Sequence, residues 1–186
     1  MKRSAIAAVL ALLTMPSFAQ LQDETLLVAV PQGYKVDFQT RQGNMLLTEM
    51  VPEGESVQTW TEMLTVQVFL GLKNATPAAY GQLMRSMQAS HCKGSLAEPI
   101  TDGQDNGYAF AVWKQSCPVV QQTGKPEITF VKAVRGNDSF YVVQKAFRSD
   151  PSAEQVIQWT QFLKAVKVCD PRIADRACVA TAAAPG

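Results

Sequence analysis

The sequence predicts an α+β domain in which an antiparallel β-sheet is flanked by two amphipathic α-helices. Runs rich in β-branched and aromatic residues dominate the middle of the chain, and short turn sequences separate them. Two other segments repeat apolar residues at helical spacing, one before and one after the main group of strands. Hairpin-joined strands between two such helices are typical of helices packed on an antiparallel sheet.

The first predicted strands precede the first helix. Residues 36–38 and 45–51 form an expected hairpin around a turn at residues 42–44, Gln-Gly-Asn. Residues 63–70, MLTVQVFL, are β-branched and aromatic and predict a further strand.

The first helix is predicted to begin at Thr76-Pro77, because threonine is a good N-cap and proline suits the first helical position. We expect it to end near Ser90. Its apolar residues recur at i, i+3, i+4 and i+7, which predicts one buried face consisting of Tyr80, Leu83, Met84 and Met87.

Three more strands are predicted after this helix, at residues 108–115, 127–135 and 140–147. Asn106-Gly107 is typical of a tight hairpin turn. The sequence Gly-Asn-Asp at residues 136–138 turns the last two strands back on each other, so this pair is expected to be antiparallel.

The second helix is predicted to have Asp150 as its cap and Pro151 as its first residue. Its apolar side is expected to contain Val156, Trp159, Leu163 and Val166, widened by Ile157 and Phe162. Residues 172–186 are alanine-rich without a strand pattern and predict a loosely ordered tail.

Residues 1–19 have the three parts of a secretory signal peptide. Lys2 and Arg3 come first, residues 5–13 are uncharged and apolar, and small residues at Ser17 and Ala19 follow Pro16. The alternative is a buried N-terminal helix. We therefore expect a periplasmic or secreted protein with a single α+β domain at residues 20–170 and a tail at 171–186, with no membrane span after cleavage.

Four cysteines follow the predicted leader, and an even number in an exported chain indicates disulfides. Three pairings are possible. We favour the local one, Cys92–Cys117 and Cys169–Cys178, because each pair flanks one continuous stretch of chain. A zinc site is not indicated, since the chain has no CxxC pair and one histidine.

The layout resembles that of a known group of proteins. Between the first hairpin and the first helix lies a long segment that includes VPEGE at residues 51–55 and WTEMLTVQ at residues 60–67. With this segment, residues 26–168 resemble uncharacterised exported bacterial proteins whose architecture is similar to the Mog1/PsbP-like α/β/α sandwich. The resemblance implies an accessory or binding protein and supplies no active-site pattern.

The charge balance excludes two kinds of partner. The chain has 17 Lys and Arg against 16 Asp and Glu, and loss of Lys2 and Arg3 with the leader leaves 15 against 16. Sequence-independent binding to nucleic acid or to an anionic membrane requires a basic surface. We therefore expect neither, whereas an unknown envelope protein remains a candidate partner.

Four carboxylates lie near one tryptophan in the chain. Glu49, Glu53, Glu55 and Glu62 surround Trp60 in sequence and could bind a cation or a basic partner. We take Glu53, Glu55, Trp60 and Glu62 as the candidate binding residues. The alternative is a solvated loop, because Pro52 and Gly54 flank Glu53.

Catalytic and metal-binding motifs are weak. His91-Cys92 pairs a thiol with a base, but Cys92 is better explained by a disulfide and His91 by an exposed helix end. Residues 102–107, DGQDNG, resemble part of a calcium loop, yet glutamine and tryptophan replace two required ligands, which favours a polar hairpin loop. We expect no cofactor and no metal.

Three classes of function remain. The first is a non-catalytic periplasmic binding or accessory protein. The second is a periplasmic inhibitor or immunity-type protein. The third is a carboxylate-based hydrolase that uses Glu53, Glu55 or Asp105, which requires two acids in one cleft. Convergent acids in a pocket would favour the enzyme, and a flat apolar patch would favour a protein partner.

Overall fold

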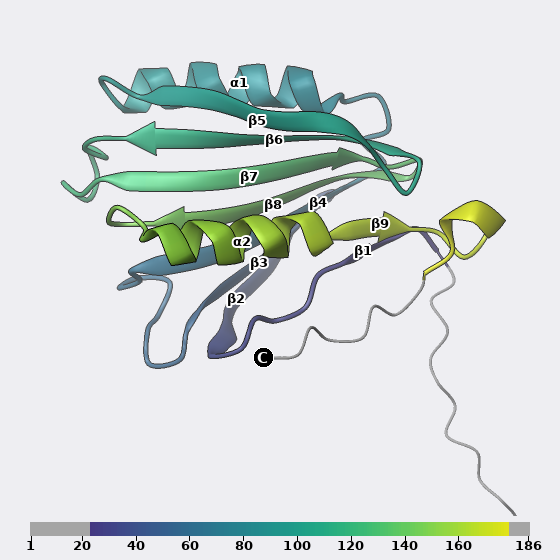
Figure 1. The fold of residues 1–186 in the computed structure, drawn as a ribbon, viewed down its shortest axis with the longest axis horizontal. Coiled ribbons are helices and arrows are strands. Elements are labelled where there is room, and N and C mark those ends of the chain that lie inside the picture. Colours follow the sequence, from purple (N-terminus) through teal and green to yellow (C-terminus); the bar gives the residue numbers. More distant parts are fainter. Residues whose placement is uncertain (1–22, 179–186) are drawn as a thin grey trace, which may run out of the picture.

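Seven antiparallel strands form the main sheet of the computed structural model, which describes residues 23–178 (Figure 1). Their order across the sheet is β2-β3-β4-β8-β7-β6-β5, and β1 and β9 form a separate two-stranded sheet. The predicted leader and residues 179–186 of the predicted tail lie outside the described residues. The strands are β1 (Thr25–Leu27), β2 (Tyr34–Gln42), β3 (Met45–Pro52), β4 (Glu62–Leu70), β5 (Leu96–Asp105), β6 (Tyr108–Cys117), β7 (Glu127–Arg135), β8 (Ser139–Phe147) and β9 (Lys167–Cys169).

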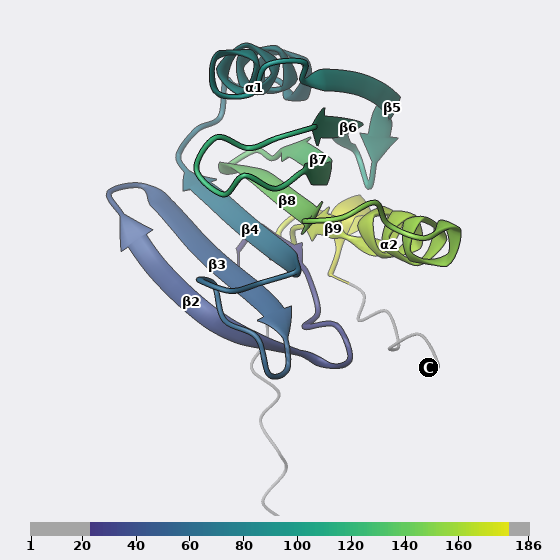
Figure 2. The ribbon, with the colours of Figure 1, turned by 90° about the vertical axis from the view of Figure 1, so that its left-hand side faces the viewer.

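The two helices, α1 (Pro77–His91) and α2 (Ala153–Ala165), lie on opposite faces of this sheet (Figure 2). Successive side chains of a strand point to opposite faces. In β7, Phe130 packs with Trp159 and Leu163 of α2, while Val131 packs with Tyr80 of α1. The molecule is therefore an α/β/α sandwich, as the sequence predicts.

The N-terminus of α1 forms as predicted, but its buried face is narrower. The Thr76 side chain accepts a hydrogen bond from the backbone N–H of Ala79. Tyr80 and Met84 pack on the sheet, whereas Leu83 and Met87 are 55% and 49% exposed. The prediction that these two residues are buried is wrong, because α1 packs on β6 and β7 and no other described element covers its outer flank.

The predicted start of α2 is also corrected. Ser152, not Asp150, is the N-cap, and its hydroxyl accepts a hydrogen bond from the backbone N–H of Gln155. The Gln155 side chain accepts one from the backbone N–H of Ser152, which completes a capping box. Trp159 and Leu163 are buried as predicted, but Ile157 is 59% exposed and does not widen the apolar side.

The segment after α2 is more ordered than predicted. β9 pairs with β1, and a short 3₁₀ helix, η1, spans Ala174–Arg176. The backbone N–H of Asp170 donates to the carbonyl oxygen of Arg176, and the Arg172 guanidinium pairs with the Asp170 carboxylate. These contacts order the described part of the predicted tail.

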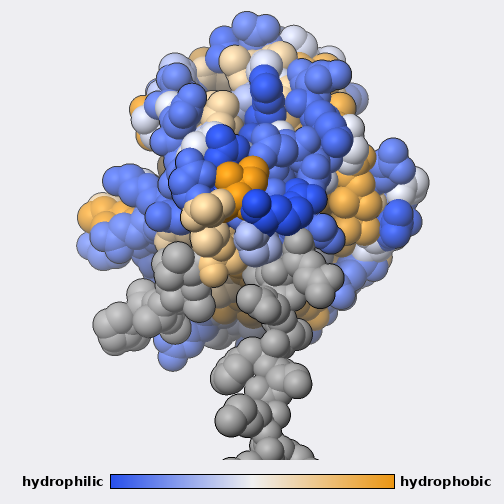
Figure 3. All heavy atoms as spheres, turned by 90° about the vertical axis from the view of Figure 1, so that its right-hand side faces the viewer, coloured by the Kyte–Doolittle hydropathy of each residue, from blue (hydrophilic) through white to orange (hydrophobic). Residues whose placement is uncertain are grey.

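Strand β5 was not predicted, because it contains Pro99, Gly103 and three acidic residues. It forms an edge of the sheet and pairs with β6 through the expected two-residue turn at Asn106-Gly107. The register shifts between Pro99 and Thr101, so Ile100 is a bulge. Bulges and charges on an edge strand oppose pairing with other chains. Figure 3 shows the end of the molecule that bears this turn; hydrophilic residues cover most of it, around small apolar patches.

Glu24 connects the N-terminal segment to the turn between β7 and β8. Its carboxylate accepts hydrogen bonds from the backbone N–H groups of Asn137, Asp138 and Ser139 and from the Tyr141 hydroxyl. The carboxylate is therefore bound by four donors, and it occupies the space that a side chain at Gly136 would need.

Gly136→Ala is expected to lower the free energy of unfolding by about 1–3 kcal/mol, the usual cost of overpacking. The new Cβ would collide with the Glu24 carboxylate and would lie 2.8 Å from the carbonyl oxygen of Ser139. Urea denaturation followed by circular dichroism measures the change. Gly81→Ala is the control: its Cβ meets only the Trp113 ring at 3.9 Å, so that variant should be unchanged or slightly more stable. Equal stability of both variants with wild type would contradict the packing described for Gly136.

Candidate functional site

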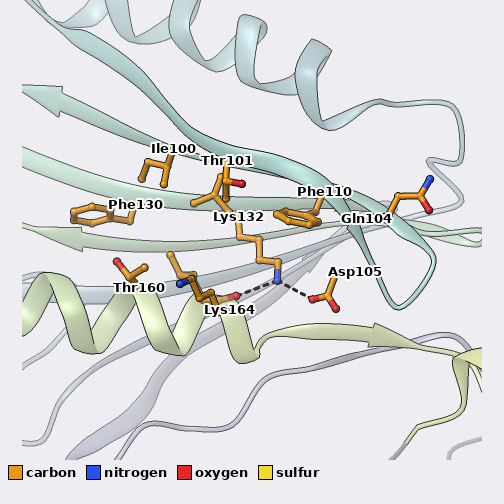
Figure 4. A pocket seen from close by; sticks show the side chains of 11 residues that line it. Ile100, Thr101, Gln104, Asp105, Phe110, Phe130, Lys132, Thr160 and Lys164 are labelled. Atoms are coloured by element: carbon orange, nitrogen blue, oxygen red, sulfur yellow. Dashed lines mark hydrogen bonds and ion pairs between the residues drawn. The ribbon is translucent and has the colours of Figure 1, made fainter.

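A cavity of about 330 Å³ lies between α2 and the part of the sheet formed by β5, β6 and β7 (Figure 4). We call it the α2 cavity. Most of its exposed lining is apolar, with a few polar side chains among it. Its lining residues are Ile100, Thr101, Gln104, Asp105, Phe110, Val112, Phe130, Lys132, Thr160, Leu163 and Lys164.

The cavity follows from the way the helix lies on the sheet. The buried side of α2 packs mainly on β4, β8 and the near side of β7, through Trp159 and Leu163. β5 is the strand farthest along this edge, beyond β6. Gly103 of β5 also has no side chain to fill the space beside Phe110. The edge hairpin and the helix therefore leave a hollow between them.

Lys132 is a buried polar residue of the cavity lining. Its side chain is 3% exposed, and its Nζ donates to the backbone carbonyl oxygens of Leu163 at 3.0 Å and Val166 at 2.7 Å. It also lies 3.4 Å from the Asp105 carboxylate and 5.1 Å from the centre of the Phe110 ring. The ammonium group thus binds free carbonyls at the C-terminus of α2, where the helix dipole favours a cation.

Burial lowers the pKa of Lys132, and the Asp105 carboxylate opposes this shift. A buried ammonium group is costly unless it is paired and hydrogen-bonded. Here three oxygen acceptors compensate for the lost water, so Lys132 both stabilises the helix end and places positive charge at the cavity.

The cavity has an excess of positive charge. Among residues 23–178, Asp105 is the only carboxylate of its lining, and that carboxylate is shared: one oxygen faces Lys132 and the other lies 3.9 Å from Lys167. Lys164 also lines the cavity, and it forms no ion pair with any residue between 23 and 178. Two lysines therefore pair with this acid, and Lys164 adds a further positive charge to the cavity lining.

The carboxylates singled out in the sequence each make contacts within the fold, and Glu55 lies next to Glu62. The Glu55 side chain accepts hydrogen bonds from the backbone N–H and the hydroxyl of Thr61, which order the loop between β3 and β4. Glu53 lies in the same loop, and its backbone N–H donates to the carbonyl oxygen of Gly33. Trp60 is buried, with the Arg148 guanidinium 3.8 Å from its ring centre. Binding by these residues stays a prediction.

Glu62 belongs to a buried cluster that the sequence pattern did not reveal. One of its oxygens lies 2.7 Å from the Nζ of Lys145, and the other accepts a hydrogen bond from Gln155 of α2. Lys145 is fully buried, 3.9 Å from the centre of the Trp159 ring and 2.5 Å from the Tyr34 hydroxyl. Burial lowers the pKa of Lys145 to about 8. This Glu62–Lys145 cluster connects β2, β4, β8 and α2.

A sequence signal for both buried lysines does exist. In β7, Lys132 lies on the same strand face as Phe130 and Val134. In β8, Lys145 lies on the same face as Val143 and Phe147. A lone lysine on an otherwise apolar strand face either is paired or lines a cavity. Lys145 is paired with Glu62, and Lys132 both pairs with Asp105 and lines the α2 cavity.

Other motifs are accounted for structurally. His91 is the last residue of α1, and Cys92 is bonded to Cys117, so there is no free thiol beside a base. Asp105 pairs with lysines, and the Asn106 amide donates to the carbonyl oxygen of Val168, so this turn holds β9. Within residues 23–178 no group of three His, Cys, Asp or Glu side chains could hold a metal ion.

The disulfides have the local pairing predicted from the sequence. Cys92–Cys117 joins the end of α1 to the end of β6, and Cys169–Cys178 joins β9 to the segment after η1. Neither lies in the α2 cavity. Within the described part of the chain, no helix has the length and apolar character that a membrane crossing requires.

Comparisons with known proteins give only distant matches. No protein-family model matches the chain, and no curated protein matches it. Among solved structures, it is similar to the Ran-binding protein Mog1p of Saccharomyces cerevisiae, with 11% identity, a TM-score of 0.44 and coverage of 76% of this chain and 85% of that one.

Two further structures are similar to this chain. One is a cyanobacterial PsbP (CyanoP) from Synechocystis, with 8% identity over 83% of this chain and 95% of that one and a TM-score of 0.42. The other is LpqN of Mycobacterium tuberculosis, involved in cell envelope biogenesis, with 10% identity over 82% and 87% and a TM-score of 0.43. Both names of the expected Mog1/PsbP-like resemblance thus occur among the matches. At these scores the likenesses carry no argument about function.

Proposed function

We propose that this chain is an exported, non-catalytic binding protein that holds a small ligand in the α2 cavity. One observation carries the proposal: a preformed, mostly apolar cavity of about 330 Å³ with a few polar groups in its lining. Sites for small molecules usually have this size and character. The two disulfides and the predicted leader support export to an oxidising compartment.

The hydrolase alternative has less support. It requires two carboxylates in one cleft, and Asp105 is the only acid in the described part of the chain that lines the cavity. Glu53 and Glu55, the other acids of this alternative, lie in the loop before β4, whose first residue is in register with Phe147 at the far end of β8. Asp105 lies beside the β5–β6 turn, at the opposite end of the sheet. Lys132 and Lys167 occupy the two Asp105 oxygens, which leaves that acid poorly placed for proton transfer.

A protein partner is the second candidate. Leu83 and Met87 expose half of their area on the outer flank of α1, which contains no acidic residue. Such a flank could contact another protein, as an accessory or inhibitory role requires. Leu83→Glu together with Met87→Glu would abolish that contact and leave the α2 cavity unchanged, so the two candidates can be separated.

The proposal is tested by a substitution on α2 that fills the cavity with a larger side chain. N-phenyl-1-naphthylamine, an uncharged apolar fluorophore, is expected to bind wild-type protein saturably, whereas Thr160→Trp should weaken binding by at least about tenfold, since the indole would occupy the cavity. Fluorescence titration gives the dissociation constants. Gln161→Trp is the matched control, because its neighbouring position is exposed and does not line the cavity. Equal binding by all three proteins, or none by wild type, would refute the proposal.

A further inference from the structure

The lining of the α2 cavity is mostly apolar, and its charged groups lie beside α2. Figure 4 shows Phe130 and Ile100 in the apolar part, and Lys132 pointing toward Asp105 and α2. Phe110, Val112 and Leu163 extend the apolar lining. A ligand that fills this space must itself have an apolar body and one polar end.

The charged residues around the cavity determine which head group of a ligand fits. Both oxygens of Asp105 face lysines, so this acid has little capacity to bind a cationic ligand. Lys164 has no acidic partner among residues 23–178, and Lys132 supplies a second positive charge to the cavity lining. The unbalanced charge at the cavity is therefore positive and favours an anion.

The volume limits the length of the apolar body. A water-sized group takes about 30 Å³, so about 330 Å³ holds roughly eleven such groups. A methylene is of similar size. A straight chain of about eight to ten carbons with one small head group fills the cavity, while a long-chain lipid does not fit within it.

We propose that the ligand is a medium-chain amphipathic acid, whose apolar chain lies against Phe110 and Phe130 and whose anionic head pairs with Lys164 on the α2 side of the cavity. This inference rests on the proposed function, because it names the ligand class of the same cavity. The chemistry is shared by carboxylates and other small monoanionic heads. Bound decanoate is the simplest probe of it.

The experiment is displacement of N-phenyl-1-naphthylamine from the full mature protein by decyl compounds below their micelle-forming concentrations. Decanoate should displace the fluorophore at about tenfold lower concentration than the neutral decanol, and the cationic decyltrimethylammonium should be the weakest. From hexanoate to decanoate, affinity should rise about fourfold per methylene, and it should stop rising once the chain exceeds the cavity.

Lys164→Gln should remove the preference for decanoate over decanol. Lys125→Gln is the matched control, since Lys125 is exposed and far from the cavity lining. Equal affinity for decanoate and decanol, or tighter binding of the cation, overturns the inference but leaves the proposed function standing. If neither the fluorophore nor any decyl compound binds wild-type protein, the proposed function itself fails.

Discussion

Lys145→Ala is expected to lower the free energy of unfolding by about 3–5 kcal/mol, because it breaks a buried ion pair and leaves one charge without its partner. The Lys145 ammonium is fully buried and pairs with Glu62 at 2.7 Å, beneath the Trp159 ring. Removal of the side chain leaves the Glu62 carboxylate without its cation and opens a hole among three aromatic rings. Urea denaturation followed by circular dichroism measures the loss.

Two variants separate the charge from the packing. Lys145→Met keeps most of the volume, and combined with Glu62→Gln it removes both charges. Replacement of a whole buried pair by uncharged groups is often close to neutral, so the double variant should be more stable than Lys145→Ala. A loss of less than about 1 kcal/mol for Lys145→Ala would mean that Lys145 is not buried in the ion pair described.

The same group predicts a pH dependence. Burial lowers the pKa of Lys145 to about 8 in the folded protein, against about 10.4 for a free lysine. Between these values the unfolded chain binds a proton that the folded protein has released, so stability rises with pH, by at most ~1.4 kcal/mol per unit. Lys145→Met should lack this part of the rise between pH 8 and 10. Above pH 10 the raised pKa of Tyr34 acts in the opposite direction, because the folded protein then retains the proton.

Leu163→Ala is expected to lower the free energy of unfolding by about 2–5 kcal/mol. Leu163 is 2% exposed and packs with Phe130 and Trp159 in the core beneath α2. The truncation removes this packing and enlarges the adjoining α2 cavity. Urea denaturation monitored by circular dichroism gives the value.

Leu83→Ala is the matched control on the other helix. Leu83 is 55% exposed, so its truncation should change the free energy of unfolding by less than about 0.5 kcal/mol. From the sequence alone both leucines were predicted to be buried. Equal losses at the two positions would show that the outer flank of α1 is covered, and a negligible loss at Leu163 would show that α2 is misplaced.

Local patterns determined most of the architecture. The β-branched and aromatic runs in β4, β6, β7 and β8, the Asn106-Gly107 turn and the Thr76-Pro77 helix start could each be predicted from a few neighbouring residues. The strands β1 and β9 could not, because each has three residues and forms by pairing between distant parts of the chain. β5 was missed because its composition suits an edge strand rather than a core one.

The α2 cavity could not be predicted from neighbouring residues, for a different reason. The site predicted from the sequence consists of Glu53, Glu55, Trp60 and Glu62, which are close in the chain. The structure places Glu62 instead in a buried ion pair with Lys145. Lys132 could have been noticed as a lysine on an apolar strand face. The cavity itself depends on how far α2 extends across the sheet, and no short-range periodicity encodes that distance.

Titration of isotope-labelled protein with decanoate, followed by two-dimensional amide NMR, tests the central claim most directly, because it locates the ligand as well as detecting it. Binding in the α2 cavity predicts the largest shifts at Ile100, Phe110, Thr160 and Lys164, with the loop that contains Glu55 and Trp60 unchanged. Shifts confined to that loop or to the Leu83–Met87 flank of α1, with the cavity amides unmoved, would contradict it.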